Sequence, residues 1–228
     1  MIKSDMPSPL GHALAGIIAA WSADLVPGHR AWRTASASAS FCDRAGGAVT
    51  LLCSGIAILP DLDLAFHAHR SVSHSLFAVA LMTIISAAVT GWVTRRPVWR
   101  VAFMCGSAYG THLLMDWLAV DTYLPYGLQV FWPFSHTWYI SGMDLFAQTE
   151  RRLLFSARSI RINLTAMGWE TAILLPIVVL LWLVRVKALA GLAPKMSGGD
   201  HATQERTRAV LGVAETGVQH IENGKADV

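Results

Sequence analysis

The stretch HSLFAVALMTIISAAVTGWV, residues His74–Val93, contains no aspartate, glutamate, lysine or arginine. Its length matches the ~20 apolar residues that a helix needs to cross the hydrocarbon core of a bilayer. Three further apolar runs approach that length, namely Pro9–Val26, Trp99–Ala119 and Met167–Val186. A fifth run, Ala45–Pro60, is shorter and predicts either a marginal span or a re-entrant segment. We therefore predict an all-α fold, a multi-pass transmembrane helical bundle with about five spans, one of them short.

The composition also favours a membrane protein. Of the 228 residues, 54% are hydrophobic and only 14% are charged, and the mean hydropathy is +0.44. A soluble domain carries roughly 25% charged residues. We expect residues 1–194 to form one domain embedded among membrane lipids, and residues 195–228 to form a polar, flexible tail. The net charge of +3 is too small to indicate a nucleic-acid partner, and the composition leaves the oligomeric state open.

The N-terminal segment has some features of a cleavable signal peptide. Lys3 precedes an apolar run, and the small-residue stretch Ala35–Ala39 follows it. Cleavage there would remove His12. Because Trp21 and Asp24 make the segment a poor signal, we expect the first helix to be retained.

Basic residues are distributed unequally between the two sides of an alternating bundle. The positive-inside rule assigns the richer side to the cytoplasm. That side carries Arg30, Arg33, Arg44, Arg95, Arg96, Arg100, Arg185, Lys187 and Lys195. The other side carries Lys3, Arg70, Arg151, Arg152, Arg158 and Arg161, and we expect it to face the periplasm or the external medium.

The segment between the fourth and fifth predicted spans is long and has two parts. Leu124–Ile140 is aromatic and interrupted by proline and glycine, which predicts a loop folded over the membrane surface. Gln148–Leu164 mixes arginines with large apolar side chains, a pattern that is typical of an interfacial helix.

Histidines and aspartates gather at those ends of the apolar runs that an alternating bundle places on one side of the membrane. Ionisable residues at membrane depth are costly, and they are usually functional or paired. Imidazole and carboxylate groups are common ligands of zinc, manganese and similar divalent ions. We predict that such residues hold one or two divalent metal ions, most consistent with zinc or manganese. The candidate metal ligands are His12, Asp61, Asp63, His69, His74, His112 and Asp116.

Two of these pairs have informative spacing. His112 and Asp116 are four residues apart, so a helix places both side chains on one face. The pair suits two metal ligands, an aspartate that orients a ligating histidine, or a purely structural contact. Asp61 and Asp63 point the same way if their backbone is extended and diverge if it is helical; they also suit a solvated span end.

Other residues offer weaker evidence for chemistry. Arg70 suits bidentate binding of a phosphate or carboxylate, although an arginine in an exposed loop often has no specific role. Ser135 and His136 are adjacent, and the sequence has no GxSxG elbow. The pattern therefore disfavours a serine hydrolase.

Several short motifs occur in an order that resembles a known family. They are Gly11-His12, Leu59–Asp63, His69–Leu76, Gly110–Asp116, Pro125–Gly127 and Phe131–Ser135. Together they resemble the LexA-regulated, inner-membrane metal-dependent hydrolase family (YdjM-like), over roughly residues 7–145. The chain departs from the pattern HR-x-x-THS at Ser73, where threonine is common, but it keeps a hydroxyl group.

The resemblance implies a multi-pass protein of the bacterial inner membrane and a metal-dependent hydrolase, without identifying a substrate. We expect a metal-activated water to attack an ester or phosphoester. Asp63 or Asp116 would act as general base, and Arg70 would bind an anionic substrate. A site at the depth of the lipid headgroups suits a lipid or lipid-linked substrate.

Two alternatives remain open at this stage. One is a non-catalytic membrane protein that handles metal ions or protons. The ionisable residues crowd one end of the predicted spans, whereas a transport pathway usually needs polar groups through the whole membrane. The other is a structural protein in which the histidines and aspartates only tie the helices together.

Overall fold

The computed structural model describes residues 6–25, 47–66, 70–93, 98–122, 124–150 and 155–190. Within these residues it contains helices and no strand, apart from two isolated backbone bridges. The elements are α1 (Pro9–Leu25), α3 (Gly47–Ile56), the 3-10 helix η2 (Leu59–Phe66), α4 (Leu76–Val93), α5 (Val98–Leu118) and α6 (Ala157–Ala190). The all-α prediction is confirmed for this part of the chain. The predicted tail, residues 195–228, lies outside the described residues.

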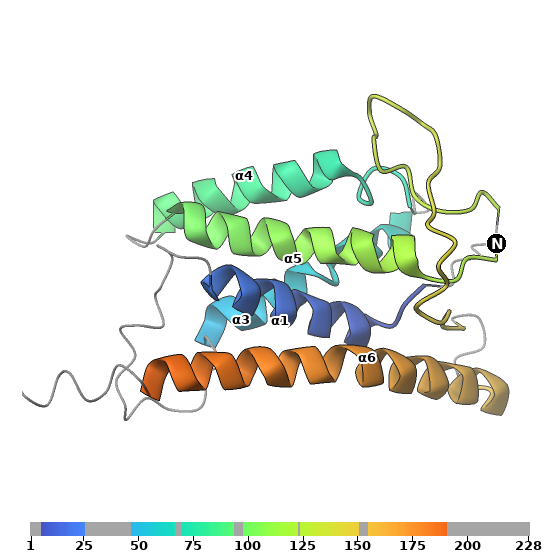
Figure 1. Cartoon of the computed structure of the whole chain (residues 1–228). Coiled ribbons are helices and arrows are strands. Elements are labelled where there is room, and N and C mark those ends of the chain that lie inside the picture. The colour runs from blue at the N-terminus through green and yellow to red at the C-terminus, as the bar shows by residue number, and fades with distance from the viewer. Residues whose placement is uncertain are drawn as a thin grey trace, which may run out of the picture.

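The helices form a bundle with α5 and α1 at its centre (Figure 1). Helix α5 packs on α4 and α1, and α1 also packs on α3 and α6. Small buried residues such as Ala20, Ala108 and Cys105 lie in the core. At Gly16 an added Cβ atom would stand 2.7 Å from the Cys53 carbonyl oxygen. A glycine is required there because α1 and α3 approach so closely.

Two helices are long and apolar enough to cross a membrane, among the residues described. They are α4 and the Ala157–Arg185 part of α6, and only 11% of each apolar window is buried. Most of their leucine, isoleucine, valine and tryptophan side chains are therefore exposed. Exposing apolar surface to water costs about 25 cal/mol per Å², so these surfaces favour contact with lipid.

The remaining predicted spans are less suited to crossing a membrane, because they are shorter or carry charged residues. Helix α5 has 21 residues but carries Arg100, His112 and Asp116. Helix α1 has 17 residues, and α3 has only 10, which corresponds to ~15 Å at 1.5 Å per residue. Helix α3 alone therefore covers about half of a ~30 Å hydrocarbon core. The structure supports a helical membrane protein, while the count of five spans stays a prediction.

The predicted separation between an interfacial helix, Gln148–Leu164, and the last span is wrong. Helix α6 runs without interruption from Ala157 to Ala190. It begins after Ser156, whose hydroxyl accepts a hydrogen bond from the Ser159 amide (3.1 Å) as a helix cap. The arginine-rich and apolar parts differ in composition, but no helix-ending signal lies between them. A change of composition alone does not end a helix.

Candidate metal centre

Four segments meet at one end of the bundle. These are the beginning of α1, the η2 helix, the segment before α4 and the last turns of α5 (Figure 1). The beginning of α1 and the end of α5 lie together because these two neighbouring helices run in opposite directions. Six of the seven predicted metal ligands lie here, and His69 lies outside the described residues. The six are His12, Asp61, Asp63, His74, His112 and Asp116.

His112 lies at the centre of the cluster and is fully buried. Its Nδ1 atom donates a hydrogen bond to the Ala57 carbonyl oxygen, at 2.7 Å. In a neutral imidazole this leaves the Nε2 atom with a free lone pair. The Nε2 atom lies 3.1 Å from the Nε2 atom of His74. The Ala57 contact thus fixes which nitrogen of His112 faces the cluster.

Two carboxylates face these nitrogens. The Oδ2 atom of Asp116 lies 3.3 Å from the Nε2 atoms of both His74 and His112. Its Oδ1 atom lies 3.4 Å from His12 Nε2. The Oδ1 atom of Asp61 lies 3.5 Å from His112 Nε2. These separations exceed the ~2.8 Å of a good charge-assisted hydrogen bond.

The buried polar atoms of Asp116 and His12 indicate a common ligand. Neither carboxylate oxygen of Asp116 and neither ring nitrogen of His12 makes a hydrogen bond of normal geometry. A buried polar atom without a partner costs about 1–3 kcal/mol. A cation among these atoms would satisfy them together.

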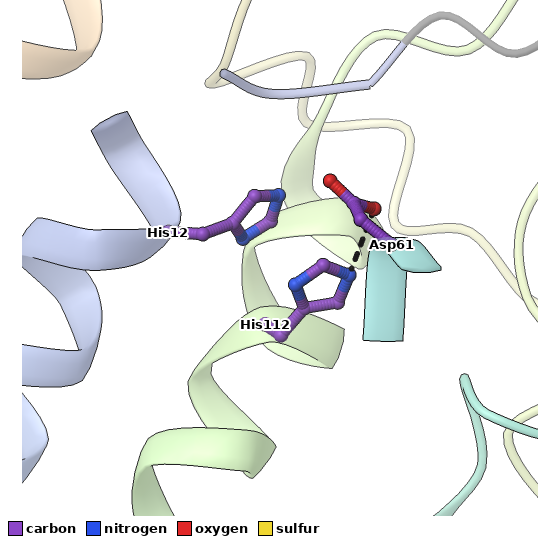
Figure 2. Close-up of side chains that lie close together, drawn as sticks. All are labelled: His12, Asp61 and His112. Carbon is purple, nitrogen blue, oxygen red and sulfur yellow. Dashed lines mark ion pairs between the residues drawn. The ribbon is translucent and has the colours of Figure 1, made fainter. Parts of the chain in front are cut away.

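The spacing of the donor atoms fits a divalent ion. Ligands at ~2.1 Å from a tetrahedral ion stand about 3.4 Å apart, and the contacts in the cluster range from 3.1 to 3.5 Å. The cluster contains two groups of three donor residues. Within each group, the donor atoms all lie within 4.8 Å of one another. One group is His12, Asp61 and His112, which face a common space from α1, η2 and α5 (Figure 2). The other is His74, His112 and Asp116.

Asp63 lies on the far side of the His74 ring. Its Oδ2 atom is 3.2 Å from His74 Nδ1, and it also accepts a hydrogen bond from the Ser73 hydroxyl. Because η2 is helical, Asp61 and Asp63 diverge, which excludes the extended alternative for this pair. Burial lowers the pKa of His74, but the neighbouring carboxylates of Asp116 and Asp63 outweigh it and raise that pKa to about 9.

The chain matches the model of one protein family over most of its length. The family model described as YdjM inner membrane protein matches residues 6–192. The chain belongs to the YdjM inner membrane protein family. The resemblance noted in the sequence is thereby confirmed, and the matched region includes the whole His/Asp cluster. No curated protein and no solved structure matches the chain.

In this member of the YdjM family, Arg70 contacts an aspartate that lies outside the cluster. Its Nη1 atom lies 2.6 Å from Asp121 Oδ2, and the same oxygen accepts a hydrogen bond from the Gly127 amide, at 2.7 Å. Arg70 has a positive φ of 66°, which is uncommon for a residue with a side chain. The contacts of Asp121 with Arg70 and with the Gly127 amide stabilise the 119–150 segment. They do not support the predicted role of Arg70 in binding an anionic substrate.

Glu170 of α6 was missed in the sequence, although it lies alone in an apolar run. It is fully buried, and its Oε1 atom accepts a hydrogen bond from the Ser8 amide, at 2.8 Å. The Ser8 hydroxyl donates to its other oxygen. That hydroxyl in turn accepts from the Gly11 amide, at 3.1 Å, and caps α1. The rarity of a lone glutamate in a membrane span was the available signal.

Proposed function

We propose that the protein is a membrane-bound, metal-dependent hydrolase. The observation that supports this proposal is the set of buried donor atoms that face one another at one end of the bundle. His12, His74, His112, Asp61 and Asp116 come from four separate segments, and all are at most 8% exposed. A grouping of three histidines and two carboxylates suits zinc or manganese.

The geometry favours one cation rather than two. The two groups of donors share His112, whose Nδ1 atom is engaged by Ala57. Only its Nε2 lone pair is then available, and one lone pair binds one ion. We infer a single ion that draws on both groups.

The cation would supply a nucleophile at neutral pH, because it lowers the pKa of coordinated water from about 15.7 to about 7. Asp63 would orient the His74 ring through Nδ1, as carboxylates commonly do behind metal-bound histidines. The Asp63 side chain is 12% exposed, the most of the six. Because the His74 ring stands between Asp63 and the other donors, Asp63 suits this orienting role, and the identity of the general base stays a prediction.

The substrate class follows from the position of the cluster at the end of the bundle. We propose an ester or phosphoester, carried by a lipid or lipid-linked molecule, and a site on the periplasmic side of a multi-pass inner-membrane protein. The distribution of basic residues in the sequence supports this orientation. Reporter fusions after Arg96 and after Lys195 test it, since a periplasmic signal at either position would reverse it.

Metal analysis of the purified protein tests the site. Wild type should contain about one equivalent of metal per chain, and His112→Ala and Asp116→Ala should lose it. His136→Ala is the matched control, because His136 is exposed and lies outside the cluster. Unchanged metal content in His112→Ala would reject the proposed site.

Hydrolysis is tested separately, with phospholipid and soluble phosphoester substrates in the presence and absence of chelator. Turnover that chelator abolishes and metal restores supports the proposal. Stoichiometric metal without turnover of any substrate would instead favour the non-catalytic alternative, a protein that handles metal ions or protons.

A further inference from the structure

Residues 124–143 form an exposed loop without formal charge. This stretch contains no aspartate, glutamate, lysine or arginine. Large apolar side chains project from it, among them Phe134, which is 91% exposed, and Leu124, which is 80% exposed. Tyr126, Phe131 and Met143 are exposed as well. A water-facing loop rarely combines so many exposed apolar side chains with no charge.

The loop has a defined structure. Leu128 and Tyr139 exchange two backbone hydrogen bonds of 2.9 Å, and Leu128 is buried. The Phe131 and Tyr139 rings meet edge to face, with centroids 5.2 Å apart. These contacts hold the Phe131 and Tyr139 rings in place, so the exposure of these two rings is a property of a fixed surface.

Backbone hydrogen bonds connect the loop to both sides of the His/Asp cluster. The Leu76 amide, two residues beyond His74, donates to the Val130 carbonyl at 2.8 Å. The Ser141 amide donates to the carbonyl of Trp117, the residue after Asp116, at 3.0 Å. The loop therefore lies directly beside the candidate metal centre (Figure 1).

The same loop is continuous with the apolar surface of α4. Phe77, in the first turn of α4, meets the Trp132 ring with centroids 5.7 Å apart. Beyond Phe77 the exposed face of α4 continues with Leu81 and Ile84. Since α4 is apolar and long enough to cross a bilayer, the loop begins where that lipid-facing surface ends.

We propose that the 124–143 loop inserts into the boundary between lipid headgroups and acyl chains. Aromatic side chains prefer this depth, and apolar residues of interfacial segments lie about 5–10 Å into it. The inserted loop brings the neighbouring cluster to the level of the headgroups. Resting on the function proposed above, this identifies the substrate as a membrane lipid whose headgroup ester or phosphoester reaches the metal centre from the bilayer.

A spin label at Phe134→Cys tests insertion without reference to catalysis. Cys42→Ser removes one native thiol, and Cys53 and Cys105 are fully buried. After reconstitution in vesicles of phosphatidylethanolamine and phosphatidylglycerol, the label should collide with oxygen more than with a water-soluble nickel chelate. A label at Ile84→Cys, in the middle of α4, gives the reference for a deep position.

Two results would overturn the insertion. One is a Phe134→Cys label as accessible to the nickel chelate as a free nitroxide in water. The other is dipolar broadening between labels without access to oxygen, which would show that a second copy of the chain covers the loop.

Turnover tests the role of the loop in presenting lipid. Phe134→Asp should lower hydrolysis of vesicle phospholipid by at least about tenfold, the effect of 1.4 kcal/mol, and leave metal content and turnover of a short-chain phosphoester unchanged. Thr137→Asp is the matched control, because Thr137 is an exposed polar residue of the same loop. Equal loss on both substrates would contradict lipid presentation. If wild type with bound metal hydrolyses neither, the proposed function fails, and the label depth alone decides insertion.

Discussion

Glu170 of α6 holds Ser8 at the beginning of α1 through both of its carboxylate oxygens. Because Ser8 caps α1 through the Gly11 amide, the last helix of the bundle fixes the first turn of the helix that carries His12. An added Cβ atom at Gly11 would collide with Glu170 Oε2 and stand 3.0 Å from Met115 Cε. A side chain at position 11 would therefore have to displace the Glu170 carboxylate that holds Ser8.

We expect Gly11→Ala to destabilise the protein by about 1–3 kcal/mol, the usual cost of overpacking a filled site. The alanine would push Glu170 from Ser8 and shift His12, so metal affinity should fall as well. Unfolding in detergent and metal titration measure the two effects. Gly55→Ala is the control, because nothing lies within 4 Å of an added Cβ atom there. Equal behaviour of the two variants would contradict the packing role of Gly11.

The helices of this protein could largely be predicted from the sequence, because long apolar runs such as His74–Val93 have few alternative structures. The continuity of α6 could not, since a change of composition within a helix resembles a boundary. The Glu170–Ser8 contact joins residues 162 positions apart. Such contacts depend on how the helices pack, which local patterns do not specify.

The candidate site was likewise predictable only in part. Two features were enough to group the histidines and aspartates. One is the i, i+4 spacing of His112 and Asp116, and the other is that an alternating bundle places the ends of the apolar runs that carry these residues on one side of the membrane. Their individual places were not predictable, because these depend on which ring nitrogen faces which oxygen. The helical turn of η2 sends Asp61 toward His112 and Asp63 toward His74 Nδ1. Asp121, the partner of Arg70, had no sequence signal at all.

Substitution of Asp63 and substitution of Asp61 should lower metal affinity to different degrees. Asp63→Asn should weaken metal binding by about 10–100-fold, as expected for a residue that orients a ligating histidine, and leave the stoichiometry at about one. Asp61→Asn should lower the affinity further, because it replaces a charged carboxylate that faces His112 Nε2 directly with a neutral amide. Competition with a chelating dye measures both. A stronger effect of Asp63→Asn would reverse the two roles.

The metal-free protein should lose stability as the pH rises toward 9. The pKa of His74 is raised from 6.5 to about 9 in the folded state. A raised pKa means that the folded state binds the proton more tightly than the unfolded state. The resulting stabilisation is complete below about pH 6.5 and is lost as the pH rises through about 9. Unfolding of the metal-free protein across this range measures the effect, and His74→Gln should abolish the slope.

Metal binding should show the opposite pH dependence. At neutral pH the metal-free His74 carries a proton, and a ligating histidine must give it up. Affinity should therefore rise by about tenfold per pH unit until the pH approaches 9, if one proton is released. Calorimetric titration in buffers of different ionisation enthalpy counts the protons. Affinity that is independent of pH would show that His74 does not bind the metal.

Arg70 and Asp121 should stabilise the 119–150 segment without affecting the metal. Their side chains are 11% and 4% exposed, and hydrogen bonds between charged groups contribute about 1.5–3 kcal/mol. Arg70→Ala and Asp121→Ala should each destabilise the protein by about that amount and keep wild-type metal content. The double variant should cost less than the sum of the two, since each single change leaves a buried charge without this partner. Strictly additive losses, or loss of metal in Arg70→Ala, would show instead that Arg70 acts on the metal centre.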